Sequence, residues 1–289
     1  MTPPLESAAR RHGRVFDEIA SEYDRHRQGY PDELIDQACR VAGLGSGDRV
    51  LEVGCGSGQL TRSLAERGLR LTAVEPGTHL ISLARQNLEG AGQVEFVNAR
   101  FEDARLPRER FRAVFSASAF HWVDPEVGWQ RAADVLVPGG TLALVQYFGL
   151  EEARSKQDQD AALAALRTVA PDIAANWPAY RDLDATLAGI ERRRDNISQA
   201  WSWLGSYDIG REYAARLFGD GQAAVMPKLT EYTPDEIGAL VRTLSFYAQL
   251  SPDQRQGLDR EHEAIYQRHG RPIRASTIAV LLTAPRAAR

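Results

Sequence analysis

Alternating apolar and polar segments divide the chain into strand-like and helix-like stretches. The strand-like runs cover residues 49–53, 69–74, 94–97, 113–117, 141–147, 223–233 and 276–283. Apolar residues at helical spacing occur over 14–23, 60–67, 78–88, 129–135 and 234–246, and a further short helix is expected to begin at Pro31. Strands that alternate with helices are typical of parallel sheets covered on both faces. The pattern therefore predicts a doubly wound α/β fold with a mostly parallel sheet of seven strands.

The stretch after residue 150 interrupts this alternation. Residues 151–220 are polar, favour helices and contain scattered tryptophan and tyrosine residues, with almost no strand-like run. We therefore expect an N-terminal helical lid over 1–45, an α/β core over 46–150, a helical cap insertion over 151–220, and the remaining core over 221–289. We expect most of these aromatic residues to form a small core within the insertion, and one or two of them to line a pocket for an organic substrate.

Composition and charge narrow the classes of function. The chain has 289 residues and a net charge of -4, which argues against binding to nucleic acid because such a surface needs excess Lys and Arg. Cys39 and Cys55 are the cysteines of the sequence, and their spacing provides neither a disulfide framework nor a metal site. The first residues lack an apolar signal core, and no run approaches the length of a membrane span. We expect a cytoplasmic protein without a membrane partner.

A glycine-rich turn follows the first strand-like run, with glycines at 54, 56 and 58. Glycines let the backbone approach a ligand where a side chain would collide. The spacing G-x-G-x-G differs from the dinucleotide fingerprint G-x-G-x-x-G, and Glu52 before the turn would repel a pyrophosphate but attract an ammonium group. Glu75, at the end of the second strand-like run, is placed to accept the hydroxyls of a ribose. The expected ligand has a ribose and a cationic or zwitterionic end.

Five segments together resemble the class I S-adenosylmethionine-dependent methyltransferases. They are VLEVGCGSG (50–58), AVEP (73–76), ARFED (99–103), AFHWVD (119–124) and LVPGGTL (136–142). The resemblance covers residues 12–148 and implies a Rossmann-like fold. It is similar to the small-molecule branch that includes trans-aconitate methyltransferase-like proteins, in which N-terminal helices with the pattern Y-D-x-x-R-x-x-Y-P close over the cofactor. The corresponding segment here is YDRHRQGYP (23–31).

The resemblance implies S-adenosylmethionine as the cofactor, together with a set of residues around it. These residues are Tyr23, Arg27, Glu52, Gly54, Cys55, Gly56, Gly58, Glu75, Pro76, Phe101, Glu102, Ser116 and Ala117. In this assignment the turn and Glu52 flank the methionine part, Glu75 binds the ribose, and residues 76, 101 and 102 surround the adenine. Gly58 would let the helix pack closely, and Cys55 is expected to be a small buried residue without a chemical role.

The acceptor side has fewer candidates. His121 follows the fourth strand-like run and could remove a proton from the acceptor near neutral pH, contact the substrate, or only pack the loop. Trp122, Trp201 and Trp203 are candidates for substrate contact. Because a methyl sulfonium is already activated, the enzyme mainly has to align the nucleophile and exclude water.

The sequence therefore predicts a methyltransferase acting on a small organic molecule, a biosynthetic intermediate among the candidates, through an oxygen, nitrogen or carbon atom. Two alternatives remain open: an enzyme that uses the cofactor for cyclisation or elimination without methyl transfer, and a non-catalytic cofactor-binding partner. An NAD-dependent oxidoreductase is disfavoured by the third glycine, which comes one residue early.

Overall fold

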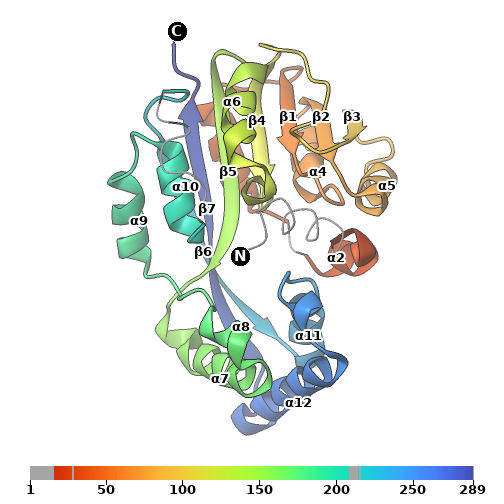
Figure 1. Cartoon of the computed structure of the whole chain (residues 1–289), viewed down its shortest axis with the longest axis vertical. Coiled ribbons are helices and arrows are strands. Elements are labelled where there is room, and N and C mark those ends of the chain that lie inside the picture. The colour runs from red at the N-terminus through yellow and green to blue at the C-terminus, as the bar shows by residue number, and fades with distance from the viewer. Residues whose placement is uncertain (1–15, 28, 208–213, 215, 289) are drawn as a thin grey trace, which may run out of the picture.

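The computed structural model of the chain describes residues 16–288 apart from 28, 208–213 and 215 (Figure 1). The first fifteen residues of the predicted lid lie outside the described residues. The strands are β1 (Arg49–Val53), β2 (Arg70–Glu75), β3 (Gln93–Asn98), β4 (Phe111–Ala117), β5 (Leu136–Gly149), β6 (Gln222–Tyr232) and β7 (Ile273–Pro285). The α-helices are α2 (Ala20–His26), α3 (Asp32–Val41), α4 (Gln59–Glu66), α5 (Thr78–Asn87), α6 (Pro125–Val135), α7 (Ala153–Val169), α8 (Pro171–Ala175), α9 (Leu183–Glu191), α10 (Ile197–Gly205), α11 (Pro234–Arg242) and α12 (Pro252–His269), and two 3-10 helices are η1 (Phe120–Trp122) and η2 (Tyr247–Gln249).

Within the described residues, the strands form one seven-stranded sheet in the order β3-β2-β1-β4-β5-β7-β6. Strand β7 is antiparallel to β5 and β6, whereas β1 to β5 pair in parallel. The predicted Rossmann-like, mostly parallel sheet is confirmed. The chain order reverses between β1 and β4, and ligands of such sheets bind outside the carboxyl ends of the strands at this point.

The pleat of the central strands builds two apolar layers. Leu51 and Val53 of β1 face a cluster that contains Trp129 of α6 and Trp201 of α10, whereas Val50 faces a cluster with helices α3 and α4. Successive residues of a strand point to opposite faces, so a continuous apolar run is required where both faces are covered. This explains why the run at 49–53 identifies a central strand.

The turn expected before the fifth strand lies inside β5 as a bulge. Phe111 of β4 pairs with Leu136, and Ala113 pairs with Thr141, so that residues 137–140 lie outside the regular ladder. Beyond the bulge, β5 continues to Gly149, which is longer than the predicted strand. Its far end, together with those of β6 and β7, carries helices α7, α8, α11 and α12 away from the main sheet (Figure 1).

The helices of the predicted cap insertion pack in two different places. Helices α7 and α8 share a small apolar cluster with Leu250 and Leu258 near α12. Helix α10 instead contributes Trp201 and Leu204 to the main core beside the sheet. The expectation of one aromatic core within the insertion is therefore wrong, although the domain boundaries themselves stay predictions.

Helix α12 was not predicted from the hydrophobic pattern. Its sequence is mostly polar, and its buried residues are Leu258, His262 and Ile265. Ser251 accepts a hydrogen bond from the backbone N–H of Gln254, whose side chain accepts one from the N–H of Ser251, which forms a capping box. This Ser-Pro-x-Gln signal could have identified the start of the helix, and Gly270 its end.

Candidate active site

A cavity of about 1490 Å³ lies at the carboxyl ends of β1, β2 and β4. Its lining includes the turns after these strands and residues of α2, and it extends to aromatic residues between 147 and 207 and to the segment around Phe246. Most predicted site residues meet here: Tyr23, Arg27, Gly54, Gly56, Glu75, Pro76, Phe101, Glu102, Ala117, His121, Trp122 and Trp203. The cavity is thus shared by the residues assigned to the cofactor and some of those assigned to the acceptor.

The glycine turn contacts the turn that follows β4. Gly54 has a φ of +73°, and a Cβ at this position would lie 2.3 Å from the Cβ of Ala119. The backbone N–H groups of Gly54 and Cys55 both donate to the carbonyl of Val74, at 2.8 and 3.1 Å. Only glycine satisfies both this backbone conformation and this approach. The close contact brings the ends of β1, β2 and β4 together at the cavity.

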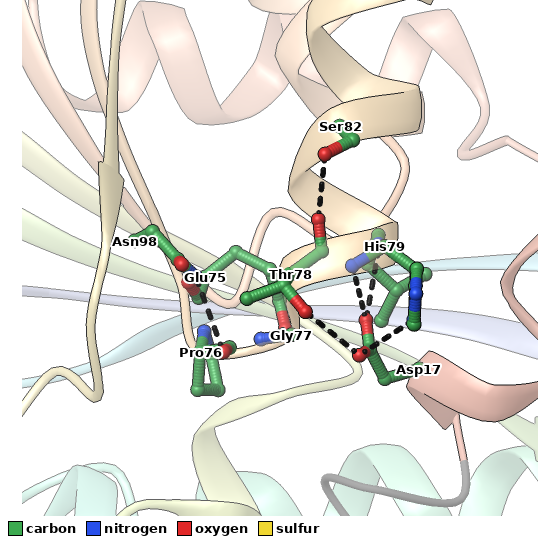
Figure 2. Close-up of polar contacts among 9 residues, drawn as sticks. Asp17, Glu75, Pro76, Gly77, Thr78, His79, Ser82 and Asn98 are labelled. Atoms are coloured by element: carbon green, nitrogen blue, oxygen red, sulfur yellow. Dashed lines mark hydrogen bonds and ion pairs between the residues drawn. The ribbon is translucent and has the colours of Figure 1, made fainter.

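Glu75 is held in a fixed position by two backbone donors. Its Oε2 accepts from the N–H of Gly56 at 3.0 Å, and its Oε1 accepts from the N–H of Gly77 at 2.9 Å. The residue is 7% exposed, and burial raises the pKa of its carboxyl, opposed by these two donors and reinforced by Asp17. Asn98 supports the same turn by donating to the carbonyl oxygens of Glu75 and Pro76 (Figure 2). Each carboxylate oxygen retains a lone pair for a ribose hydroxyl.

Asp17 caps helix α5 from the N-terminal segment. Its Oδ1 accepts from the backbone N–H of His79 and Leu80 at 2.7 and 3.0 Å, and its Oδ2 lies 3.0 Å from Nδ1 of His79 (Figure 2). The helix has no side-chain cap of its own at Gly77. A carboxylate at a helix N-terminus is stabilised by the free N–H groups and the helix dipole. Asp17 also lines the cavity, and the sequence offered no local signal for it because the helix it caps lies about 60 residues away.

The adenine candidates come from the loop after β3. Phe101 is buried and lies under Arg131, whose Cζ is 5.6 Å from the ring centroid. Glu102 Oε1 accepts from Nη2 of Arg100 and from the backbone N–H of Asp124, both at 2.8 Å. The second contact joins this loop to the start of α6. These hydrogen bonds hold Glu102 at the cavity wall, where Phe101 lies beside it in the chain.

Helix α2 closes one side of the cavity. The guanidinium of Arg27 stands over the Tyr23 ring at 5.2 Å and donates from Nη2 to the carbonyl of Thr243 at 2.9 Å. Burial raises the pKa of the Tyr23 hydroxyl. Within the described residues, Nε of Arg27 is buried without a hydrogen-bond partner. An unpaired buried donor beside the glycine turn fits an acceptor group on a ligand.

His121 and Trp122 lie in η1, directly after β4. The His121 ring is stacked on the Tyr207 ring, with centroids 4.8 Å apart and planes at 8°, and its centroid is 4.5 Å from that of Trp122. Gln146 of β5 donates from Nε2 to the Tyr207 hydroxyl. The predicted base therefore belongs to an aromatic stack on the cavity wall, and Tyr207 is a member that the sequence analysis did not single out.

Five predicted site residues lie beneath the cavity rather than in its wall: Glu52, Cys55, Gly58, Ser116 and Trp201. Glu52 is 1% exposed, and its Oε2 accepts from Oγ1 of Thr61 at 2.7 Å. Burial raises the pKa of Glu52 to about 7. The expectation that its charge faces a ligand is corrected, because its carboxyl group points into the layer between β1 and α4.

The other buried residues have packing roles. A Cβ at Gly58 would lie 2.8 Å from Cδ1 of Leu88, which agrees with the expected close packing of this helix. Ser116 donates to the carbonyl of Val53 at 2.8 Å and so ties β4 to β1. Trp201 is 1% exposed within the main core, so its assignment to substrate contact is wrong.

Within the described residues, no group of three or more His, Cys, Asp or Glu side chains is arranged to hold a metal ion. No helix in the same residues is both long and apolar enough to cross a membrane.

The sheet order, the glycine turn and the fixed carboxylate after β2 define the fold of a class I S-adenosylmethionine-dependent methyltransferase. The comparison with protein families agrees: residues 51–144 match the model of a methyltransferase domain. This part of the chain is similar to methyltransferase domains whose methyl donor is S-adenosylmethionine. Glu75, Gly56 and the free donor of Arg27 fit such a group. The trans-aconitate methyltransferase-like branch stays a prediction.

Curated relatives share the methyltransferase region. An uncharacterized methyltransferase of Mycobacterium tuberculosis is 38% identical over 130 residues, which cover 45% of this chain and 51% of that protein. The demethylmenaquinone methyltransferase of Clavibacter sepedonicus is 30% identical over 143 residues, covering 46% and 56%. The chain thus spans about half the length of the curated relatives it matches.

Solved structures match a larger part of the chain at low sequence identity. A candidate type II methyltransferase of Anaeromyxobacter dehalogenans has a TM-score of 0.59 and 22% identity, and the match covers 90% of this chain and 97% of that one. A candidate methyltransferase from an antibiotic biosynthesis pathway of Anabaena variabilis has a TM-score of 0.54 and 16% identity, covering 86% and 96%. These likenesses support the fold alone.

Proposed function

We propose that this protein is an S-adenosylmethionine-dependent methyltransferase that acts on a small organic molecule through an oxygen, nitrogen or carbon atom. The observation that carries the proposal is one continuous cavity, which joins the fixed carboxylate of Glu75 to the aromatic residues Trp122, Trp203 and Tyr207. A cavity lined by cofactor residues and aromatic rings suits an acceptor with an apolar body. The net charge of -4 supports a small molecule over a nucleic acid.

Different residues of the cavity are assigned to different parts of the cofactor. Glu75 accepts hydrogen bonds from the ribose hydroxyls, Phe101 and Glu102 border the adenine, and Tyr23 and Arg27 close over the methionine part. The cofactor supplies a methyl group on a positively charged sulfur. The aromatic side chains exclude water and hold the acceptor in line, which is the main requirement of this transfer.

His121 is the candidate for a proton acceptor. His121 lies in η1 and lines the same cavity as the cofactor candidates and the aromatic side chains. A phenol, an amine or a carbon acid needs to lose a proton, and histidine can accept one near neutral pH. A carboxylate acceptor needs no such base.

Calorimetric titration with S-adenosylhomocysteine tests the cofactor site. We expect binding to the wild type and a loss of about tenfold or more in affinity for Glu75→Gln, which removes an acceptor of charge-assisted hydrogen bonds. Asp160→Asn, at an exposed position outside the cavity lining, serves as the control. Equal affinity of all three proteins would contradict the assignment of Glu75.

Turnover distinguishes the proposal from its alternatives. We expect S-adenosylhomocysteine to accumulate when the protein is supplied with S-adenosylmethionine and a pool of small organic acceptors. Formation of a new product without S-adenosylhomocysteine would indicate cyclisation or elimination. Binding without consumption of any component would indicate a non-catalytic partner.

A further inference from the structure

Arg181 is a cavity-lining residue to which neither the fold nor the cofactor assigns a role. Its backbone is anchored where β5 ends: its N–H donates to the carbonyl of Gly149, and its carbonyl accepts from the N–H of Glu151, both at 2.8 Å. The residue pairs with Leu150 in an isolated bridge. The position of Arg181 is therefore fixed by the sheet, although it belongs to the segment between α8 and α9.

The guanidinium of Arg181 lies over two aromatic rings. Its Cζ lies 5.1 Å from the centroid of Phe148 and 4.9 Å from that of Trp203. Nη2 donates to the carbonyl oxygens of Trp203 and Leu204. These ring contacts and hydrogen bonds restrict the rotamers of the side chain before any ligand binds.

Among the described residues, two donor groups of Arg181 have no hydrogen-bond partner, and its guanidinium has no counter-ion. There, Nε and Nη1 donate no hydrogen bond, and no carboxylate forms an ion pair with the guanidinium. Burial lowers the pKa of Arg181, since desolvation disfavours the charged form. A partly buried cation without a counter-ion is costly unless an anion binds there.

Apart from Asp172, the other charged residues of the cavity wall named here are paired, cap a helix or belong to the cofactor side. Arg100 pairs with Glu102 at 2.8 Å, and Arg27 stands over Tyr23 beside the glycine turn. Asp182 caps helix α9 by accepting from the N–H of Ala185 at 2.7 Å. Asp172, in the first turn of α8, also lines the cavity.

We propose that Arg181 determines acceptor specificity by binding a carboxylate of the substrate, whose apolar body lies against Trp203 and the neighbouring aromatic rings. The acceptor is accordingly an organic acid with an aromatic or similarly flat apolar part, and the methyl-accepting atom lies nearer the cofactor side. This inference rests on the proposed function, since it concerns the acceptor end of the same cavity.

Matched pairs of anionic and neutral probes test the assignment in protein saturated with S-adenosylhomocysteine. The probes are 3-phenylpropanoate with 3-phenylpropanamide, and indole-3-acetate with indole-3-acetamide, titrated by calorimetry. We expect the wild type to bind each anion about tenfold or more tightly than its amide, as for a hydrogen bond to a charged group. Arg181→Gln should bring this ratio close to one, and Arg181→Lys should retain part of it.

Arg193→Gln is the matched control. The Arg193 guanidinium lies over the same indole, 4.7 Å from the Trp203 centroid, but the residue does not line the cavity. We expect it to keep the wild-type preference for anions, and all variants to keep the affinity for S-adenosylhomocysteine, which shows that they are folded. A wild type without preference for either anion, or a preference that survives Arg181→Gln, overturns the inference. Failure of the wild type to bind S-adenosylhomocysteine would instead contradict the proposed function.

Discussion

Substitution of Gly54 by alanine tests how the cavity is built. Two costs apply at this position: a φ of +73°, which a residue with a Cβ adopts unfavourably, and a Cβ at 2.3 Å from that of Ala119. The first cost is about 1 to 2 kcal/mol. The second requires the turns after β1 and β4 to separate, and overpacking of this kind costs about 1 to 3 kcal/mol. We expect Gly54→Ala to lower the free energy of unfolding by about 2 to 5 kcal/mol.

Gly90→Ala separates the two costs. Gly90 has a φ of +77°, and a Cβ there would meet no atom within 4 Å. This variant should lose only the backbone contribution of about 1 to 2 kcal/mol. Urea unfolding of both variants gives the difference directly. We also expect Gly54→Ala, but not Gly90→Ala, to weaken binding of S-adenosylhomocysteine, because the same turn carries the N–H of Gly56 to Glu75.

A double-mutant cycle with Ala119→Gly provides the decisive result. Removal of the Ala119 Cβ leaves its Cα as the nearest atom to the new side chain, at 3.8 Å, which is an ordinary contact. The double variant should therefore recover about 1 to 3 kcal/mol relative to the sum of the two single variants. Additive effects, or equal losses for Gly54→Ala and Gly90→Ala, would refute the reasoning that the two turns are in contact.

Three further predictions concern charge. Because burial raises the pKa of Glu52 from 4.5 to about 7, the folded state keeps a proton that the unfolded chain has lost, and wild-type stability falls as the pH rises through this range. Glu52→Gln lacks this titration, so its stability relative to wild type in urea should rise by roughly 2 to 3 kcal/mol between pH 5 and 8; a constant difference would contradict this. Asp158→Asn should cost about 2 kcal/mol or more, since the buried Asp158 carboxylate binds the partly exposed Arg271 at 2.7 Å and the backbone N–H of Arg274 at 2.8 Å, whereas the exposed Asp160→Asn should cost less than about 1 kcal/mol; similar costs would argue against a buried carboxylate at 158. His121→Gln should keep the affinity for S-adenosylhomocysteine and lower kcat by about 100-fold or more, and unchanged turnover would exclude a base at this position.

The cofactor half of the cavity could be predicted because its residues act locally. Strands β1 and β2 are largely buried and read as apolar runs, and Gly54 and Glu75 mark their ends. Gly54, Gly56 and Glu75, which were predicted to bind the cofactor, line the cavity. Glu52 does not line the cavity, because successive residues of β1 point to opposite faces of the sheet and its side chain points toward α4. The charge of Glu52 alone did not show on which face of the sheet it lies.

Contacts between distant segments could not be predicted in the same way. Asp17 caps a helix that begins at Thr78, and the Nη2 group of Arg181 binds carbonyl groups more than 20 residues away. Neither residue stands in a motif, and each is an ordinary polar residue in its local sequence. Helix α12 was not predicted because its mostly polar sequence has too few apolar residues to show helical spacing, although the sequence of its capping box could have been recognised.

This difference between local and distant contacts bears on how acceptor specificity is determined. The turns that hold the cofactor depend on glycine conformations that few substitutions can reproduce, as at Gly54. Arg181 lies instead between α8 and α9, in a segment that pairs with the backbone of Gly149, and Trp203 lies in α10, which packs against the main core. Substitutions there change the charge and shape of the cavity without disturbing the ends of β1, β2 and β4. The fold therefore permits the acceptor to change while the cofactor site is retained, which is why acceptor identity has to be read from Arg181 and its neighbours rather than from the glycine turn.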